Sequence, residues 1–163
     1  MIYLPDGPER PNQAALEAFW TEARASNPEI GDEYQVRWFG TDAKTTRGIF
    51  GYIKEGVKTA TYTVPWILEQ EGVPLAYAGD YIVLIDYDGT PAMLLRIGKA
   101  EAWEFEAIDE RVTHTDGLSV RDPNVWKPLH KTFWNSELKR YGLEVTDDMP
   151  VLVEHFERVF DKV

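Results

Sequence analysis

The sequence predicts a fold of the α+β class, because amphipathic helical patterns flank a stretch that is dense in strand signals. Near the amino terminus, Leu16, Phe19, Trp20 and Ala23 recur at helical spacing behind Pro11, a residue suited to a first helical turn. The Asn27-Pro28 pair then ends the pattern. We therefore predict an amphipathic helix over residues 12–26.

Strand signals are densest between residues 79 and 105. Apolar stretches over 81–86 and 92–97 flank Asp88-Gly89, a pair typical of tight hairpin turns. This pattern predicts a β-hairpin. Further strands are expected over 58–64, where Thr and β-branched residues dominate, and over 100–105 and 149–160.

Three more helices and one single helical turn are predicted before, between and after these strands. Asp42 is a suitable cap, and Gly56 a suitable end, for a helix over 43–55. A short helix over 66–71 follows Pro65, and Ile108 to Val112 fits one helical turn. The longest predicted helix covers 124–141, with apolar positions at Val125, Leu129, Phe133 and Leu138.

The composition is that of one globular unit. A chain of 163 residues with 44% hydrophobic residues can bury one ordinary core. We predict a single domain, with a helical extension over about 11–33 and a core over about 34–163. With no cysteine, no leader pattern and no apolar run long enough for a bilayer, we expect a cytoplasmic protein without membrane contact.

The net charge of −11 argues against a general RNA coat protein, because phosphate binding depends on basic side chains. The acidic residues are unevenly spread, however. Residues 40–62 hold four basic and two acidic side chains: Lys44, Arg47, Lys54 and Lys58 against Asp42 and Glu55. A local electropositive cleft on an acidic body is therefore expected around Lys58.

The motif Gly56-Val57-Lys58-Thr59-Ala60-Thr61 resembles the Gly-x-Lys-x-x-Thr element of the ASCH family, relatives of the PUA domains that bind modified RNA. Further elements follow at suitable distances: residues 79–86, 88–91 and 108–110, Trp126 with His130, Phe133 and Trp134, and a closing strand over 151–160. The resemblance runs from about residue 34 to the end. It implies a PUA-like β-barrel with peripheral helices, and a cleft lined by the Lys element.

Members of this family include proposed RNA binders, ribonucleases and acetylcytidine amidohydrolases. In the amidohydrolases the catalytic groups are the Lys and Thr of the motif and a Glu after the short helix. The resemblance places them at Lys58, Thr61 and Asp116. Many longer members carry Glu-Gly-Glu-Gly-Asp at the third position, where this chain has only the carboxylate of Asp116 over residues 116–120. Asp is also one methylene shorter than Glu.

The residue types allow more than one role at each of these positions. Lys58 is suited to bind phosphate, polarise a carbonyl or act as a base, and otherwise is a solvated lysine at a strand end. Thr61 is a nucleophile or an ordinary strand residue, and Asp116 an acid/base group or a turn residue. Three residues apart, Lys58 and Thr61 lie on opposite faces of a regular strand, so they converge only across a turn or bulge.

Five more residues are predicted to contact a ligand. Tyr62 and Trp66 are candidates to line a nucleobase pocket, and Arg96 and Arg121 to contact phosphate. His130 pairs with His114 in a ribonuclease hypothesis, as acid and base, although a helical His four residues from Trp126 is also typical of packing. The three His show no metal-ligand spacing, so we predict no metal site and no cofactor.

We thus predict a protein that binds RNA or a modified nucleoside in a cleft at Lys58, with hydrolysis of an amide such as that of acetylcytidine as the reaction. A ribonuclease and a non-catalytic RNA-binding or adaptor module are the alternatives. The sequence leaves the oligomeric state open.

Overall fold

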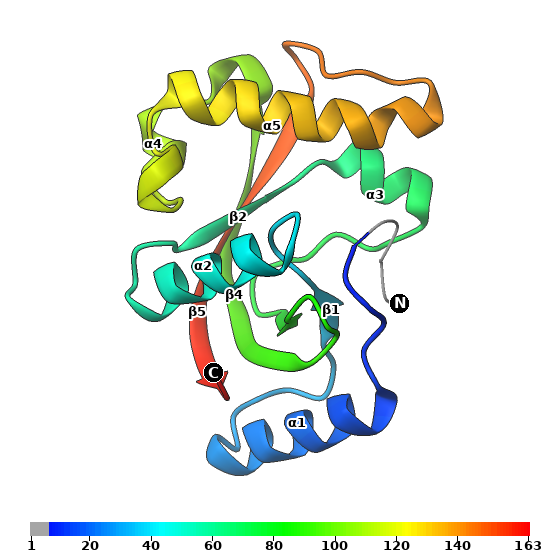
Figure 1. Cartoon of the computed structure of the whole chain (residues 1–163), viewed down its shortest axis with the longest axis vertical. Coiled ribbons are helices and arrows are strands. Elements are labelled where there is room, and N and C mark those ends of the chain that lie inside the picture. Colours follow the sequence, from blue (N-terminus) through cyan, green and yellow to red (C-terminus); the bar gives the residue numbers. More distant parts are fainter. Residues whose placement is uncertain (1–6) are drawn as a thin grey trace.

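The computed structural model describes residues 7–163 as an open, strongly bent sheet with helices on both faces and at both ends (Figure 1). The helices are α1 (Gln13–Ser26), α2 (Ala43–Lys54), α3 (Pro65–Glu71), α4 (Glu110–Thr113) and α5 (Pro123–Leu138). The strands are β1 (Gln35–Arg37), β2 (Ala60–Thr63), β3 (Tyr81–Ile85), β4 (Pro91–Glu104) and β5 (Pro150–Asp161). The α+β prediction is confirmed. Within the described residues, no helix is long and apolar enough to cross a membrane.

The strand order is β1-β3-β4-β5-β2, with β1 parallel to β3 and the other neighbours antiparallel. The sheet is not closed into a barrel, because β1 and β2 form its two edges. The predicted hairpin at Asp88-Gly89 joins β3 to β4. Gly89 adopts φ +84° there, a backbone conformation that suits glycine.

We predicted separate strands over 92–97 and 100–105, and this was wrong. They form the single strand β4, which pairs along its length with β5. The register shifts between Ile97 and Lys99, where Gly98 lies, and again between Leu94 and Leu95. Such bulges bend a strand without ending it. They account for the curvature of β4 and β5 in Figure 1.

Both faces of β3 are covered by helices. Val83 and Ile85 pack with α1, whose buried residues Leu16, Phe19, Trp20 and Ala23 are those that the helical pattern predicted. Ile82 and Leu84 alternate with them and pack on α2. A third apolar cluster joins α3, α5 and the first half of β5 at the other end of the molecule. In Figure 1, α5 and α1 accordingly lie at opposite ends.

Helix α2 carries the chain into the Lys58 segment. As predicted, Asp42 caps it, accepting a hydrogen bond from the Thr45 backbone N–H at 2.7 Å, and Gly56 follows its end with φ +72°. The backbone N–H groups of Val57 and Lys58 then both donate to the Tyr52 carbonyl, at 2.8 and 3.1 Å. Because those N–H groups bond back to the helix, the strand predicted from Lys58 begins only at Ala60.

Helix α5 buries a different face from the one predicted. Leu138 is buried as expected, but Val125, Leu129 and Phe133 are exposed. The aromatic side chains of Trp126 and Trp134 fill the core instead. The larger rings bury more apolar area, so they determine which face of the helix turns inward.

Two truncations on α5 test this assignment. Leu138→Ala removes a fully buried side chain and is expected to lower the free energy of unfolding by about 2–5 kcal/mol. Leu129→Ala, on the same helix at 52% exposure, is expected to change it by less than about 0.5 kcal/mol. Urea unfolding followed by tryptophan fluorescence measures both, and equal losses would contradict the assignment.

Candidate functional site

A cavity of about 860 Å³ opens between β1, α2, β2 and α5. It falls in the size range of small-molecule sites in proteins, about 300–1,000 Å³. Most of its wall is apolar or aromatic, and a few polar side chains project into it. The polar residues used below are Arg37, Lys58, Thr61, Tyr62, Asp116 and His130.

Lys58 and Asp116 form an ion pair in the wall of this cavity. The Lys58 Nζ lies 2.8 Å from Asp116 Oδ1, and the two residues are only 5% and 7% exposed. The ammonium also lies 4.9 Å from the centre of the Tyr62 ring, within reach of a cation–π contact. Lys58 and Asp116, which the resemblance places in one site, are thus in contact although 58 positions separate them in the sequence.

Both oxygens of Asp116 are held in place. Oδ1 accepts from the Gly117 backbone N–H at 2.7 Å, and Oδ2 accepts from Trp126 Nε1 at 3.0 Å. Trp126 is fully buried on α5, so the carboxylate is anchored to the core of the molecule. The shorter side chain of Asp therefore reaches Lys58, because the loop carries its backbone close to β2.

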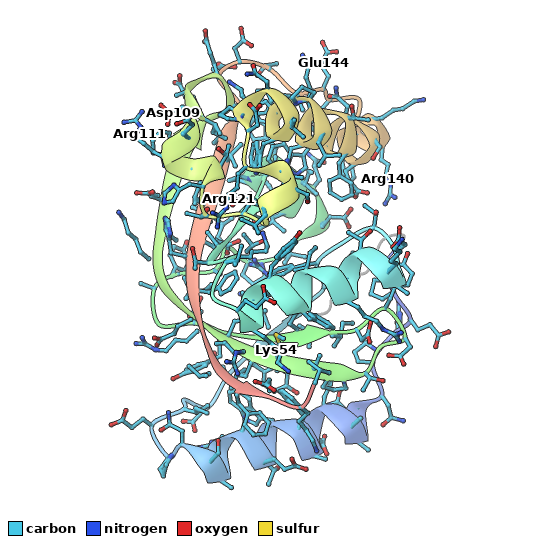
Figure 2. The ribbon with its side chains drawn as sticks, turned by 60° about the vertical axis from the view of Figure 1, so that its left-hand side comes forward. Lys54, Asp109, Arg111, Arg121, Arg140 and Glu144 are labelled. Atoms are coloured by element: carbon cyan, nitrogen blue, oxygen red, sulfur yellow. The ribbon has the colours of Figure 1, made fainter. Side chains whose placement is uncertain are left out.

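Arg121 joins the two segments that carry this pair. Its Nε donates to the Asp116 carbonyl and its Nη2 to the Val57 carbonyl, both at 2.9 Å. The Thr59 backbone N–H adds a third link, to the Thr115 carbonyl at 2.9 Å. In Figure 2, Arg121 lies between α5 and α2, whereas Asp109 and Arg111 project at the edge of the molecule. Arg121 is not among the described residues that line the cavity.

Burial and pairing act in opposite directions on the two charges. Burial lowers the pKa of Lys58, and the neighbouring carboxylate of Asp116 only partly offsets this. Burial works to raise the pKa of Asp116, but the Lys58 charge and the hydrogen bonds from Lys58 and Gly117 hold that pKa below its ordinary value. Asp116 is therefore a carboxylate, and Lys58 is an amine from which a proton is removed more easily than from a solvated lysine.

Aromatic rings support the pair from the α5 side. The Tyr62 hydroxyl donates to Thr115 Oγ1 at 2.7 Å, because Thr115 already donates its own proton to the Val112 carbonyl. Burial raises the pKa of Tyr62 well above its ordinary value, so the phenol stays protonated. The Tyr62 ring meets the Trp126 ring edge to face at 4.9 Å.

His130 presents a fixed hydrogen-bond acceptor in the cavity. Its ring stacks on Trp126 with centroids 3.7 Å apart, and its Nδ1 lies 2.8 Å from the Trp126 carbonyl. A carbonyl only accepts, so Nδ1 carries the hydrogen and Nε2 is left with its lone pair. Burial lowers the pKa of His130 to about 4, which keeps the ring neutral at neutral pH.

Thr61 shares the cavity with Lys58. Lys58 precedes β2, so the strict alternation of a strand does not separate the two side chains. Within residues 7–163, the Thr61 hydroxyl has no hydrogen-bond partner. It is therefore available to a ligand.

Other predicted residues lie elsewhere. Trp66 packs against the apolar cluster of α3 and α5 and does not line the described cavity. Arg96 lies 3.7 Å from Glu157 beside a separate, shallow hollow of about 520 Å³ on β4 and β5. His114 is exposed and bonds the Glu110 carbonyl, so it does not meet His130. In the described part of the chain, no three His, Asp or Glu side chains gather as metal ligands.

Sequence reasoning did not single out Arg37 or Glu154. Arg37 Nη1 lies 2.8 and 3.0 Å from the two carboxylate oxygens of Glu154, which is fully buried. A signal was present, since Glu154 interrupts the apolar strand that begins at Val151, and a carboxylate there needs a buried partner.

A model of the ASCH domain family matches residues 35–160, and the chain therefore belongs to this family. The family is part of the PUA-like superfamily, and ASCH domains are generally RNA-binding. The match begins at β1, so the helical segment before it lies outside the family model.

Two solved structures are similar over nearly the whole chain. An ASCH domain from Lactobacillus crispatus JV V101 has 20% identity and a TM-score of 0.81, covering 96% of this chain and 99% of that one. Protein EF3133 from Enterococcus faecalis V583, of family DUF984, has 24% identity and a TM-score of 0.80, covering 92% and 90%. These similarities confirm the predicted PUA-like fold. No curated protein matches the sequence.

The low pKa of His130 makes stability depend on pH in a definite direction. The unfolded chain binds a proton at His130 below about pH 6.5, whereas the folded protein resists it down to about pH 4. Stability from the neutral ring is thus present above pH 6.5 and lost as the pH falls toward 4. Relative to His130→Gln, the wild type is expected to lose about 2–3 kcal/mol across this range.

Urea unfolding at several pH values measures this loss. His114→Gln, at an exposed position, is the matched control and is expected to follow the wild-type curve. Parallel curves for the wild type and His130→Gln would show that burial does not keep this ring neutral.

Proposed function

We propose that the protein binds a modified nucleoside or RNA end in the cavity and hydrolyses an amide on the base, with Lys58, Thr61 and Asp116 as catalytic residues. The supporting observation is that all three line one cavity in which Lys58 and Asp116 form a buried ion pair. The volume suits a nucleoside, and the aromatic wall suits a planar base.

Lys58 has the properties of a general base for this reaction. A lysine acts as a base only when its environment favours the neutral amine, and burial lowers the pKa of Lys58 in spite of the neighbouring carboxylate. Asp116, with both oxygens engaged, is suited to orient Lys58 and to stabilise the ammonium that forms. This arrangement follows the logic of serine-lysine hydrolases, with Thr61 in the place of serine.

In the proposed reaction, the Thr61 hydroxyl oxygen attacks the amide carbonyl carbon while its proton passes to the Lys58 amine. The carbon–nitrogen bond then breaks, and Lys58 returns that proton to the nitrogen that leaves with the nucleoside. An ester on Thr61 remains. Water attacks this ester while Lys58 takes a proton from it. Lys58 then returns this proton to the Thr61 oxygen as the ester bond breaks, which releases a carboxylic acid and restores the hydroxyl and the neutral amine.

RNA binding without turnover is the second candidate, and the family relationship favours it. The test is retention of short RNA that weakens with salt, in the absence of any chemical change. A ribonuclease that uses His114 and His130 as acid and base has less support, because His114 is exposed just after the end of α4.

Lys58→Arg tests the base directly. Arginine retains a positive charge beside Asp116 but does not give up a proton at accessible pH. Release of cytidine from acetylcytidine, followed by chromatography, is expected to fall by about 10²–10⁴-fold. Lys54→Arg, an exposed lysine at the end of α2 (Figure 2), is the matched control and is expected to keep wild-type turnover.

Turnover that persists in Lys58→Arg would argue that a positive charge alone suffices. No turnover in the wild type would transfer support to RNA binding. Thermal unfolding of each variant shows whether it is folded.

Substitution of Thr61 tests the nucleophile. Thr61→Val keeps the shape of the side chain and removes the hydroxyl, so acetylcytidine hydrolysis is expected to become undetectable. Thr61→Ser keeps the hydroxyl and is expected to retain turnover within about tenfold of the wild type. Mass spectrometry of quenched reactions is expected to detect an acetylated wild type and an unmodified Thr61→Val protein. Equal turnover by Thr61→Val and Thr61→Ser would exclude Thr61 as the nucleophile.

A further inference from the structure

A second polar cluster lies in the same cavity, on the β1 side. Arg37 lines the cavity, and its Nη1 contacts both oxygens of Glu154 at 2.8 and 3.0 Å. Its Nη2 donates to Gln35 Oε1 at 3.1 Å, and the Thr63 hydroxyl donates to Glu154. The guanidinium is therefore fixed in one orientation by a carboxylate that is entirely buried.

This cluster lies beside the proposed nucleophile. In the antiparallel register of β2 and β5, Thr61 stands opposite Glu154, and Thr63 follows Thr61 on the same face of β2. A ligand whose amide reaches Thr61 therefore has Arg37 as a neighbour in the same cavity.

Arg37 retains donors that the protein does not use. A guanidinium carries five N–H groups. Its acceptors within residues 7–163 are Glu154, Gln35 and, at 3.5 Å, Thr63. This leaves the Nε–H and one N–H of Nη2 without an acceptor in the described protein, in a side chain that remains 13% exposed.

The charges around the cavity compensate one another. Among residues 7–163, three cationic side chains line it: Arg37, Lys44 and Lys58. Two carboxylates line it as well, Asp116 and Glu137, and Glu154 lies directly behind Arg37. His130 is neutral. A phosphate in the cavity would meet no excess of positive charge, and near Arg37 it would approach a buried carboxylate, so an uncharged ligand is favoured.

We infer that Arg37 determines which ligand this cavity accepts: its two unused N–H groups select a base with two adjacent acceptors, and the buried carboxylate of Glu154 behind it disfavours a charged phosphate. Cytosine offers such a pair, a carbonyl oxygen next to an unprotonated ring nitrogen. Uracil places an N–H beside its carbonyl, and two donors then face each other. This inference rests on the proposed function, since it assigns a specificity-determining residue to the site of Lys58 and Thr61.

Calorimetry with cytidine, uridine and cytidine 5′-monophosphate tests this, because none of the three is turned over. The wild type is expected to bind cytidine at least about tenfold more tightly than either competitor. Arg37→Lys keeps a charge beside Glu154 but loses the planar set of donors. It is expected to weaken cytidine binding by about tenfold or more and to remove the preference over uridine. Arg111→Lys, exposed and paired with Asp109, is the matched control.

Glu154→Gln provides a second, independent variant in case Arg37→Lys does not fold. Gln retains hydrogen bonds to Arg37 and Thr63 but removes the buried negative charge. The affinity for the monophosphate relative to cytidine is expected to rise by about tenfold or more. An unchanged ratio, or a wild type that binds all three ligands equally or none of them, overturns the inference.

The two proposals are separable in these data. Cytidine binding that depends on Arg37, in a protein without acetylcytidine turnover, overturns the proposed reaction and leaves the inference intact. Acetylcytidine turnover in a protein that binds the three ligands equally overturns the inference and leaves the proposed reaction intact.

Discussion

The buried ion pair between Lys58 and Asp116 is the interaction around which the two halves of the molecule are arranged. Removing two charges from water costs several kcal/mol per ion unless hydrogen bonds replace the lost solvent. Here the Gly117 N–H and the Trp126 indole supply those bonds to the carboxylate. The loop after α4, the segment before β2 and helix α5 must therefore come together at one point. The hydrogen bonds of Arg121, and the backbone hydrogen bond from Thr59 to Thr115, hold the loop after α4 against the segment before β2.

Stability alone does not explain such a pair. Well-packed apolar residues of similar size often stabilise a core as well or better than a buried salt bridge. A lysine that is kept close to a carboxylate, partly deprived of water and open to a cavity instead fits the proposed role of a general base. The Thr61 hydroxyl, which has no hydrogen-bond partner within residues 7–163 and lines the same cavity, supports that interpretation of Lys58. The placement of Lys58, Asp116 and Thr61 in one cavity is therefore what supports the reaction proposed for this ASCH domain.

The cavity contains two ion pairs with different characters. Lys58 and Asp116 sit where loops meet a helix, and burial makes the lysine easier to deprotonate. Arg37 and Glu154 join two strands of the sheet, and an arginine does not lose its proton in proteins. The first pair is suited to proton transfer and the second to fixed recognition. Because each pair is internally compensated, the two pairs add no net charge to the cavity, although the chain as a whole carries a net charge of −11.

The sequence by itself determined the features that depend on neighbours along the chain. The cap at Asp42, the buried face of α1 and the turn at Gly89 each follow from residues within a few positions. The tertiary structure decided what depends on distant partners. It paired Arg37 with Glu154 across 117 positions, turned Leu129 outward in favour of the larger Trp126, and kept the sheet open. Local preferences are set by steric and hydrogen-bonding rules among adjacent residues, whereas these outcomes depend on which surfaces the folded chain brings together.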